Sequence, residues 1–457
     1  MSKIKSSPVL NMTEGRPMSL LLRFAVPLFI GNLLQQLYNL ADTAIAGHLL
    51  GDTALAQIGA TSTLCTLITN FAFGMNNGLA LSVSRNFGAG DEKRMKSSVA
   101  WMVTLSLAVA LLMMSGFLLL ETPLLRAMQV PSSVFDGAVQ YLTVILAAIP
   151  FTMCYNLESG LLQSVGNSIT PLCFLLFSSV LNVVLDLLFM GPFGMGIRGA
   201  AIATAASQAI SAVLGLAYII LRYPILRFSW RDFRVRPRYV LDMLWTGFSM
   251  GLMSALYNIG SVLLQSSINA LGNVYIAAQV ASRRIAELFY IPGVALGTGV
   301  ATFASQNYGA GKRSRILSGI KNAILLYLLW WLLALAFVFT LAPAAVRFVT
   351  GTSEAEIVSS SVLYLRISIP MIPPMAVLTV VRNALQGMRH SVAPLISSSL
   401  ELIGKALFAA FLVPVYGYFA VCVCEPIIWV ICFVFIVAAA FCFRKDFRNS
   451  SLPQSVR

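Results

Sequence analysis

The sequence contains 457 residues, of which 58% are hydrophobic and only 11% are charged. A soluble globular domain usually carries about 25% charged residues, so this composition excludes a water-soluble globule. The mean hydropathy is +0.83, and the apolar runs have a length of about 20 residues, with which a helix crosses the hydrocarbon core of a bilayer. The sequence therefore predicts an all-α integral membrane protein.

Charged, glycine and proline residues divide the chain into apolar segments that are long enough to cross a membrane. An even number of crossings places both termini on the same side. Twelve transmembrane helices are predicted, at residues 18–41, 54–82, 97–120, 137–162, 168–190, 199–221, 240–268, 275–304, 316–341, 357–386, 391–413 and 416–443.

The basic residues are distributed unevenly between the two sides of the predicted membrane. On one side lie 23 of the 31 Lys and Arg residues, whereas the loops on the other side hold only Arg126, Arg198 and Arg347. Cytoplasmic loops are enriched in Lys and Arg, so we expect both termini in the cytoplasm and the chain in the inner or plasma membrane. Topology and anionic lipid then account for the net charge of +14, and nucleic acid is excluded as a partner.

The two halves of the chain repeat each other. The segment Arg85–Gly90 matches Gln306–Gly311, which lies 221 positions later, and the other matching pairs are separated by 219 to 223 positions. We therefore predict two homologous six-helix bundles with parallel topology and a pseudo-twofold axis along the membrane normal. The expected lobes are residues 1–221 and 240–457, joined by a basic cytoplasmic linker at 222–239.

Ionisable residues inside a membrane are costly and are candidates for function. Asn182 and Asp186 are four residues apart, so they lie on the same side of one helical turn. Two intramembrane aspartates that face one cavity can bind and release protons or hold Na⁺, and the alternative is a hydrogen-bonded contact between helices. The acids within the predicted spans are Asp42, Glu158, Asp186, Glu287, Glu401 and Glu425.

Basic residues within the spans occur only in the second half of the chain. Glu287 follows Arg283 by four residues, and Glu401 precedes Lys405 by four, so the spacing predicts an ion pair in each case. The alternative for the first group is a site for an anion or substrate. The basic residues concerned are Arg283, Arg284, Arg366, Arg382 and Lys405.

Prolines interrupt several of the predicted helices. Each proline removes a backbone hydrogen bond and permits a kink, which favours a bundle that moves over a passive anchor. The sequence contains no Walker motif, redox-cofactor motif or catalytic triad, so we expect neither an enzyme nor direct use of ATP, and no cofactor. The prolines lie at Pro27, Pro150, Pro292, Pro370, Pro373, Pro374 and Pro426.

Four motifs occur in order along the chain. They are Tyr38-Asn39-Leu40-Ala41-Asp42-Thr43, the repeated Gly-Ala-Gly turn, Leu181-Asn182-Val183-Val184-Leu185-Asp186 and Gly199-Ala200-Ala201-Ile202-Ala203-Thr204. This ordered set resembles the MATE (multidrug and toxic compound extrusion) transporters over essentially the whole chain. The resemblance implies two six-helix bundles around a central cleft, alternating access, and exchange of an organic, often cationic substrate for H⁺ or Na⁺.

The resemblance also implies roles for individual residues. Asp42, Asn182 and Asp186 match the cation-coupling residues of the first and fifth helices, where Na⁺ can bind, and Pro27 matches the proline at which the first helix bends. The surrounding polar network is matched by Tyr38, Tyr141, Asn156 and Thr204.

The second half departs from the NorM-type pattern of a seventh-helix glutamate and a tenth-helix aspartate. The corresponding spans offer Tyr257, Asn258, Arg366 and Arg382 instead, so the chain resembles the DinF-like branch more closely. We expect a cation-coupled antiporter for organic compounds that needs membrane lipid but no obligate protein partner. The alternative is a flippase for a lipid-linked pyrophosphate or oligosaccharide precursor, because arginine binds phosphate in a bidentate manner.

Overall fold

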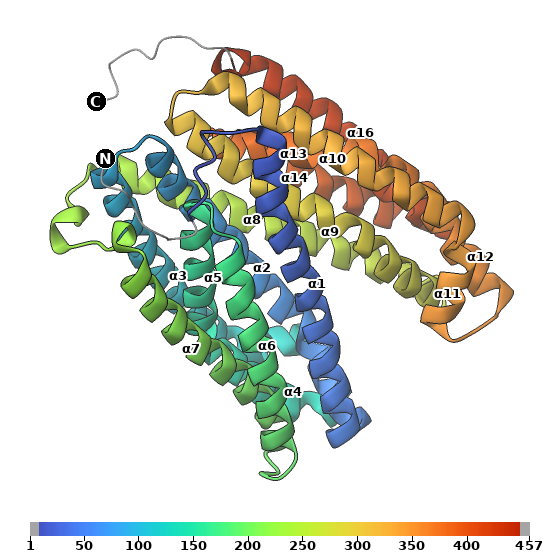
Figure 1. Ribbon diagram of the computed structural model, residues 1–457. Coiled ribbons are helices and arrows are strands. Elements are labelled where there is room, and N and C mark those ends of the chain that lie inside the picture. The colour runs from blue at the N-terminus through green and yellow to red at the C-terminus, as the bar shows by residue number, and fades with distance from the viewer. Residues whose placement is uncertain (1–8, 448–457) are drawn as a thin grey trace. The chain divides into compact units, whose positions relative to one another are not determined.

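The computed structural model describes residues 9–447, and these residues form helices joined by short turns (Figure 1). Four bases that were counted on the cytoplasmic side, Lys3, Lys5, Arg448 and Arg457, lie outside the described residues. The first half contains α1 (Pro17–Leu50), α2 (Asp52–Gly88), α3 (Glu92–Ala127), α4 (Ser132–Ala147), α5 (Ile149–Ser164), α6 (Ile169–Met190) and α7 (Gly196–Arg222), followed in the linker by the short turns η1 (Pro224–Leu226) and η2 (Trp230–Phe233).

The second half repeats this pattern of long helices with more interruptions. It contains α8 (Pro237–Asn269), α9 (Asn273–Gly309), α10 (Arg313–Thr340), α11 (Ala342–Thr350), α12 (Ala355–Ser368), η3 (Ile369–Met371), α13 (Ile372–Gly387), α14 (Val392–Leu407), η4 (Phe408–Leu412), α15 (Val413–Tyr416), α16 (Tyr418–Cys442) and η5 (Arg444–Phe447).

The predicted membrane spans are confirmed as helices. Within residues 9–447, eleven helical segments are long and apolar enough to cross a bilayer, and α4 and α5 together form one further span that is bent by 45°. The bend falls at Pro150, the second residue of α5, where a proline cannot donate the backbone hydrogen bond that a continuous helix requires. The all-α membrane fold with up to twelve spans is therefore as the sequence predicts.

The other predicted breaks differ in form. The tenth span passes through the 3₁₀ turn η3, which contains Pro370, and the eleventh passes through the π-helical turn η4. By contrast, Pro27, Pro292 and Pro426 lie inside helices that continue through them. A proline in a long membrane helix is tolerated where neighbouring groups satisfy the carbonyl that it leaves free.

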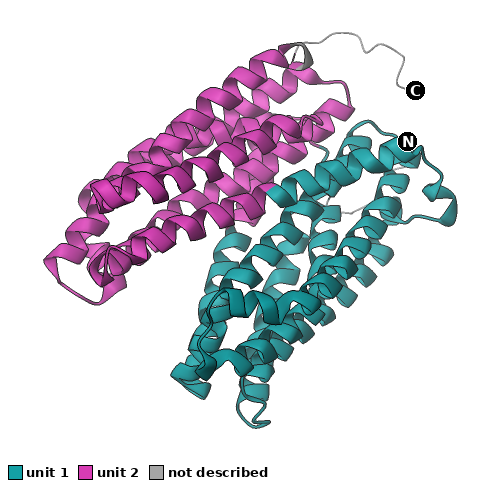
Figure 2. Cartoon of the chain, turned by 180° about the vertical axis from the view of Figure 1, so that it is seen from behind, with its two compact units in different colours: residues 1–11, 30–252 teal, residues 12–29, 253–457 magenta. Residues whose placement is uncertain are grey.

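The chain forms two compact units (Figure 2). Unit 1 consists of Ile30–Leu252 and the chain before Met12, and unit 2 consists of Met12–Phe29 and Met253–Arg457. Each unit therefore takes the first part of one helix from the other half of the sequence: α1 begins in unit 2, and α8 begins in unit 1. The predicted lobes follow the two repeats along the chain. The compact units differ from them because the beginning of α1 belongs to unit 2 and the beginning of α8 belongs to unit 1.

The repeated Asn and Gly-Ala-Gly motif holds these exchanged segments. In unit 1 the Asn86 amide donates hydrogen bonds to the hydroxyls of Ser98, at 2.7 Å, and of Tyr239 near the start of α8, at 2.8 Å. In unit 2 the equivalent Asn307 amide donates to the Met12 carbonyl, at 3.0 Å, just before α1. A buried amide with fixed partners orients the segment that it binds, so the motif has the same task in both repeats.

Small residues allow close packing inside unit 1. A side chain added at Gly78 of α2 would lie 2.7 Å from the Cα atom of Gly247 in α8, so the two helix backbones approach each other directly. Membrane helices associate through such small residues because lipid provides no hydrophobic drive for their contact. The outer surfaces of the helices are apolar, with Leu119, Leu221 and Val415 each more than 70% exposed, as expected of side chains that face lipid.

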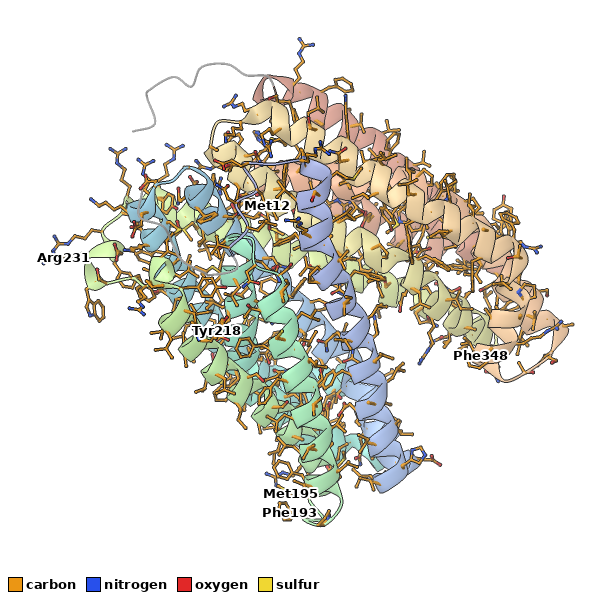
Figure 3. The ribbon with its side chains drawn as sticks, in the orientation of Figure 1. Met12, Phe193, Met195, Tyr218, Arg231 and Phe348 are labelled. Carbon is orange, nitrogen blue, oxygen red and sulfur yellow. The ribbon has the colours of Figure 1, made fainter. Side chains whose placement is uncertain are left out.

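The two ends of unit 1 differ in charge. Figure 3 shows Arg231 in the linker at one end and Phe193 and Met195, in the turn between α6 and α7, at the other. The linker and its flanks, residues 222–238, contain six arginines, whereas the turn at 191–195 contains no charged residue. The uneven distribution of basic residues, from which the topology is predicted, therefore corresponds to a difference between the two ends of this unit.

Candidate functional site: a carboxylate pair in unit 1

The centre of the candidate site is a pair of carboxyl groups on α1 and α6. Asp42 and Asp186 lie next to each other, although they are 144 positions apart in the sequence. Asp186 is fully buried, and one oxygen of each group, Oδ1, is buried without a hydrogen-bond partner. Two acids that touch in a buried setting repel each other when both are charged, so the pair requires a proton or a cation.

The Asn182 amide fixes the position of Asp186. In the amide orientation that gives both atoms a partner, Asn182 Nδ2 donates to Asp186 Oδ2 at 2.8 Å, and its oxygen accepts from the Thr204 backbone N–H of α7 at 3.2 Å. The Tyr38 hydroxyl lies near the Thr204 side chain. The four-residue spacing of Asn182 and Asp186 thus places both groups in one site, as their sequence positions predict.

The remaining residues of the predicted network take different positions. Tyr141 of α4 is 8% exposed and packs in an apolar group with Ala46 and Met190 beside the carboxylate pair. The Asn156 amide instead donates to the Thr152 carbonyl on its own helix, at 2.9 Å. The structure therefore brings Tyr141 to the boundary of the site, and Asn156 is engaged by its own helix rather than by a carboxylate.

The arrangement suits a small monovalent cation or a proton. The two unpartnered oxygens, Asp42 Oδ1 and Asp186 Oδ1, are hard anionic ligands of the kind that bind alkali cations and protons. Among the residues that the structure describes, no group of three or more His, Cys, Asp or Glu side chains is placed to hold a metal ion. The chemistry available is therefore reversible binding of one positive charge between α1 and α6.

Unit 1 holds one further buried acid. Glu158 of α5 is 5% exposed, and a side chain at Gly215 of α7 would overlap its Oε2 atom. The sequence identified Glu158 as an acid within a span but gave no partner for it. Only the packing of α5 against a glycine of α7 explains how the carboxyl group fits.

The polar residues of unit 2 form an ion-pair network around Glu425 of α16. Arg283 Nη1 lies 2.7 Å from Glu425 Oε1, and Lys405 Nζ lies 3.4 Å from the same oxygen. The Tyr364 hydroxyl donates to Glu425 Oε2 at 3.2 Å. Glu425 and Lys405 side chains are each only 3% exposed, so the network neutralises charges that water does not reach.

The predicted pairing of Glu401 with Lys405 is wrong. Glu401 Oε1 lies 2.6 Å from Arg382 Nη2 of α13, and Lys405 Nζ instead donates to Ser261 Oγ of α8 at 3.0 Å. The physical reason is that a four-residue spacing permits contact along one helix but does not require it. Both side chains reach neighbouring helices that offer them a better buried partner.

The predicted pair of Arg283 with Glu287 forms, with a distance of 4.0 Å between the charged atoms. The other arginines of this half lie apart from the network. Arg284 is exposed, and Arg366 is exposed with its guanidinium 5.8 Å from the centre of the Phe339 ring. The structure therefore joins Arg283, Lys405 and Glu425, and separately Arg382 and Glu401, but it does not bring the four arginines together as one group.

Comparison with known proteins agrees with this architecture. The MatE family model matches the chain twice, at residues 27–188 and 250–411, which are the two repeats. A probable multidrug resistance protein YpnP of Bacillus subtilis (strain 168) is 33% identical over 67% of this chain and 68% of its own length. A probable multidrug resistance protein NorM of Thermotoga maritima is 24% identical over 87% of this chain and 85% of its own length.

The fold is also that of solved structures. The crystal structure of MATE in the bent conformation has a TM-score of 0.86 and 23% sequence identity, and the match covers 97% of this chain and 99% of that one. An outward-facing multidrug resistance MATE family transporter of the MOP superfamily has a TM-score of 0.86 and 22% identity over 97% and 100% of the two chains. Two matched repeats, together with the identity of 33% to the Bacillus subtilis relative, establish that this chain belongs to the MatE family of membrane transporters.

Proposed function

We propose that the chain is a cation-coupled antiporter that exports organic, cationic or amphipathic compounds by alternating access. The observation that carries the proposal is the contact between Asp42 and Asp186, each with one buried oxygen that lacks a partner. A site that needs one positive charge in unit 1 can exchange H⁺ or Na⁺ between the two sides of the membrane. The relatives named as multidrug resistance and multidrug export proteins support organic compounds as the substrate class.

Pro27 is proposed as the conformational residue of this exchange. It lies in α1 two positions before Phe29, the last residue that belongs to unit 2, and Asp42 lies on the same helix in unit 1. The equivalent helix α8 begins with Pro237 but has no proline in its interior. A proline weakens the hydrogen bonding of a helix at one point, and here that point immediately precedes the passage of α1 from one unit to the other.

The orientation and the branch of the family are part of the proposal. The six arginines of residues 222–238, together with Arg85 at the end of α2 and the bases Lys93, Arg94 and Lys96 at the start of α3, support a cytoplasmic position for that end of unit 1 and for both termini. On the helices where NorM-type members carry a glutamate and an aspartate, unit 2 has Tyr257, Asn258, Arg366 and Arg382, which supports a closer relation to the DinF-like branch than to NorM-type members.

The alternative of a lipid flippase depends on four free arginines. Arg283 and Arg382 are each bound to a buried glutamate, so their guanidiniums are neutralised within the protein. The remaining two, Arg284 and Arg366, lie on α9 and α12 without a shared partner in any described contact. These pairings support export of an organic compound over translocation of a pyrophosphate.

The proposal is tested by substrate efflux from proteoliposomes with a pH gradient and a Na⁺ gradient imposed separately. We expect one gradient to drive efflux in the wild-type protein, and we expect Asp42→Asn and Asp186→Asn each to abolish it, because an amide keeps the shape of the acid but cannot bind the ion or proton. Asp136→Asn, which changes an exposed carboxylate at the start of α4, is the matched control and should keep normal efflux.

The outcome that contradicts the proposal is wild-type efflux under both gradients in either aspartate variant. Asp42 and Asp186 would then be a contact between helices and nothing more. Folding is monitored in each variant by monodispersity in detergent, so that loss of efflux is assigned to the site and not to misfolding.

A further inference from the structure

The ion-pair network of unit 2 lies at the repeat positions of the carboxylate site in unit 1. The matching sequence segments have offsets between 219 and 223 positions. We added an offset in this range to each of the six site residues of unit 1. Five of them then give a residue of the unit 2 network, and the exception is Asp186, which gives Ala409. Tyr38 corresponds to Tyr257 and Asp42 to Ser261 at 219, Thr204 to Glu425 at 221, and Tyr141 to Tyr364 and Asn182 to Lys405 at 223.

Matching sequence segments near these residues support the assignment. Leu162-Gln163 and Pro171-Leu172 match Leu385-Gln386 and Pro394-Leu395 at 223, and the latter pair begins the helix that carries Lys405. Gly196 and Gly417 are separated by 221 and have φ values of 59° and 58° at the start of α7 and α16. Matching these two glycines, which both have a positive φ, aligns Thr204 with Glu425.

One contact is found at matching repeat positions in both groups. In unit 1 the Asn182 oxygen accepts from the Thr204 backbone N–H at 3.2 Å, and in unit 2 Lys405 Nζ lies 3.4 Å from Glu425 Oε1. The centre of the Tyr257 ring lies 4.0 Å from Lys405 Nζ. The Lys405 ammonium donates to Ser261 Oγ at 3.0 Å and pairs with Glu425 at 3.4 Å. It therefore contacts the residues at the repeat positions of Tyr38, Asp42 and Thr204.

The charges of the two groups are opposite in kind. Unit 1 has two acids, Asp42 and Asp186, and no basic side chain among their described contacts. Unit 2 has Ser261 in place of the first acid and Ala409, at an offset of 223 from Asp186, in place of the second. It supplies instead a buried ammonium that is 3% exposed.

We propose that the Lys405 ammonium is a tethered cation that permanently occupies the unit 2 equivalent of the coupling-ion site. Unit 2 is then held in the state that an ion would induce, without exchanging one. The Lys405 side chain passes over Gly260 of α8, where an added Cβ would lie 3.0 Å from its Cδ atom, so its alkyl stem has a path to the site that a larger residue would block. Cation–π attraction to Tyr257 and the ion pair with Glu425 stabilise the ammonium there.

This inference rests on the proposed role of the unit 1 site, but its test does not need transport. Lys405→Ala removes the ammonium and leaves a space lined by Ser261, Tyr257 and Glu425. We expect a loss of several degrees in melting temperature that is restored in a saturable manner by ethylammonium or propylammonium chloride, and not by tetramethylammonium chloride. Lys405→Met, which fills the space without a charge, is the matched control and should show no recovery.

A second variant keeps the inference testable if Lys405→Ala does not fold. Lys405→Asn with Ser261→Asp restores in unit 2 the two residues that unit 1 has at these positions. In an Asp42→Asn background, which disables the unit 1 site, this double variant should gain a saturable stabilisation by Na⁺ or by lower pH that Asp42→Asn alone lacks.

Two results would overturn the inference. One is a Lys405→Ala protein that folds but is not restored by any alkylammonium ion. The other is a double variant with no more cation dependence than Asp42→Asn. A failure of the proposed function looks different, since it appears as normal efflux in Asp42→Asn and leaves the recovery of Lys405→Ala by alkylammonium ions unchanged.

Discussion

Glu401→Gln tests which cation neutralises the buried acid of α14. Glu401 and Arg382 side chains are 9% and 14% exposed, and their charged atoms lie 2.6 Å apart. Removing one member of a buried pair leaves the other charge without compensation and costs about 3 kcal/mol or more. Arg382 retains only the hydrogen bond to Ser397 Oγ, at 2.8 Å, and its buried Nε has no partner, so we expect Glu401→Gln to destabilise the protein by about 3 kcal/mol.

The assay is a double-mutant cycle measured by equilibrium unfolding in mixed micelles. Combining Glu401→Gln with Arg382→Met should recover much of the loss, with a coupling energy of about 2 kcal/mol. Combining Glu401→Gln with Lys405→Met should give additive losses, because Lys405 is bound by Glu425. Coupling of Glu401 to Lys405 and not to Arg382 would refute the assignment and restore the pairing that the sequence spacing suggests.

Four further substitutions test other parts of the structure. Pro27→Ala should slow efflux several-fold with little change in substrate affinity, because it strengthens α1 where bending is proposed; normal rates with lost substrate binding would make Pro27 a binding residue. Gly215→Ala should cost about 1–3 kcal/mol of stability because its Cβ overlaps Glu158, and the loss should shrink in a Glu158→Ala background. Asn86→Ala should lower the free energy of unfolding by about 1–2 kcal/mol, because it removes the hydrogen bonds from Asn86 to the hydroxyls of both Ser98 and Tyr239. Tyr239→Phe removes only one of these bonds and should lower it less, as measured by thermal unfolding.

The fold follows from the sequence because its signals are local and strong. Apolar length alone identifies each span, and the 45° bend coincides with Pro150. The repeat is also visible, since the Gly-Ala-Gly turns need glycines of positive φ, at Gly90 and Gly311, that few other residues can replace. The exchange of the beginnings of α1 and α8 is not local, because the sequence does not state which bundle the first turns of a helix pack against.

The candidate sites also contain some relations that are local in the sequence and others that depend on contacts between helices. The relation of Asn182 to Asp186 is a spacing within one helix and could be predicted. The relation of Glu401 to Arg382 depends on how two helices are rotated against each other, and a stronger local pattern, Glu401 with Lys405, pointed to the wrong partner. Ser261 and Tyr364 have no chemical signal of their own, and only their offsets of 219 and 223 from Asp42 and Tyr141 identify them.

The difference between the two units leads to a prediction about dynamics. If unit 1 exchanges a cation while unit 2 keeps the Lys405 ammonium, then loading the site should stabilise only the helices that meet at Asp42 and Asp186. Hydrogen–deuterium exchange compares the wild-type protein with the Asp42→Asn, Asp186→Asn double variant at one pH, where the amides imitate the neutralised pair.

We expect slower exchange in the variant for peptides from residues 30–50, α6 and α7, because removing the repulsion between two buried acids lowers the population of locally opened states. Peptides from α14 and α16 should exchange alike in both proteins, since the ion pairs around Glu425 are the same in each. Equal protection gained in both groups of helices would show that unit 2 also responds to loading, and its ammonium could then not be a fixed substitute for an exchanging ion.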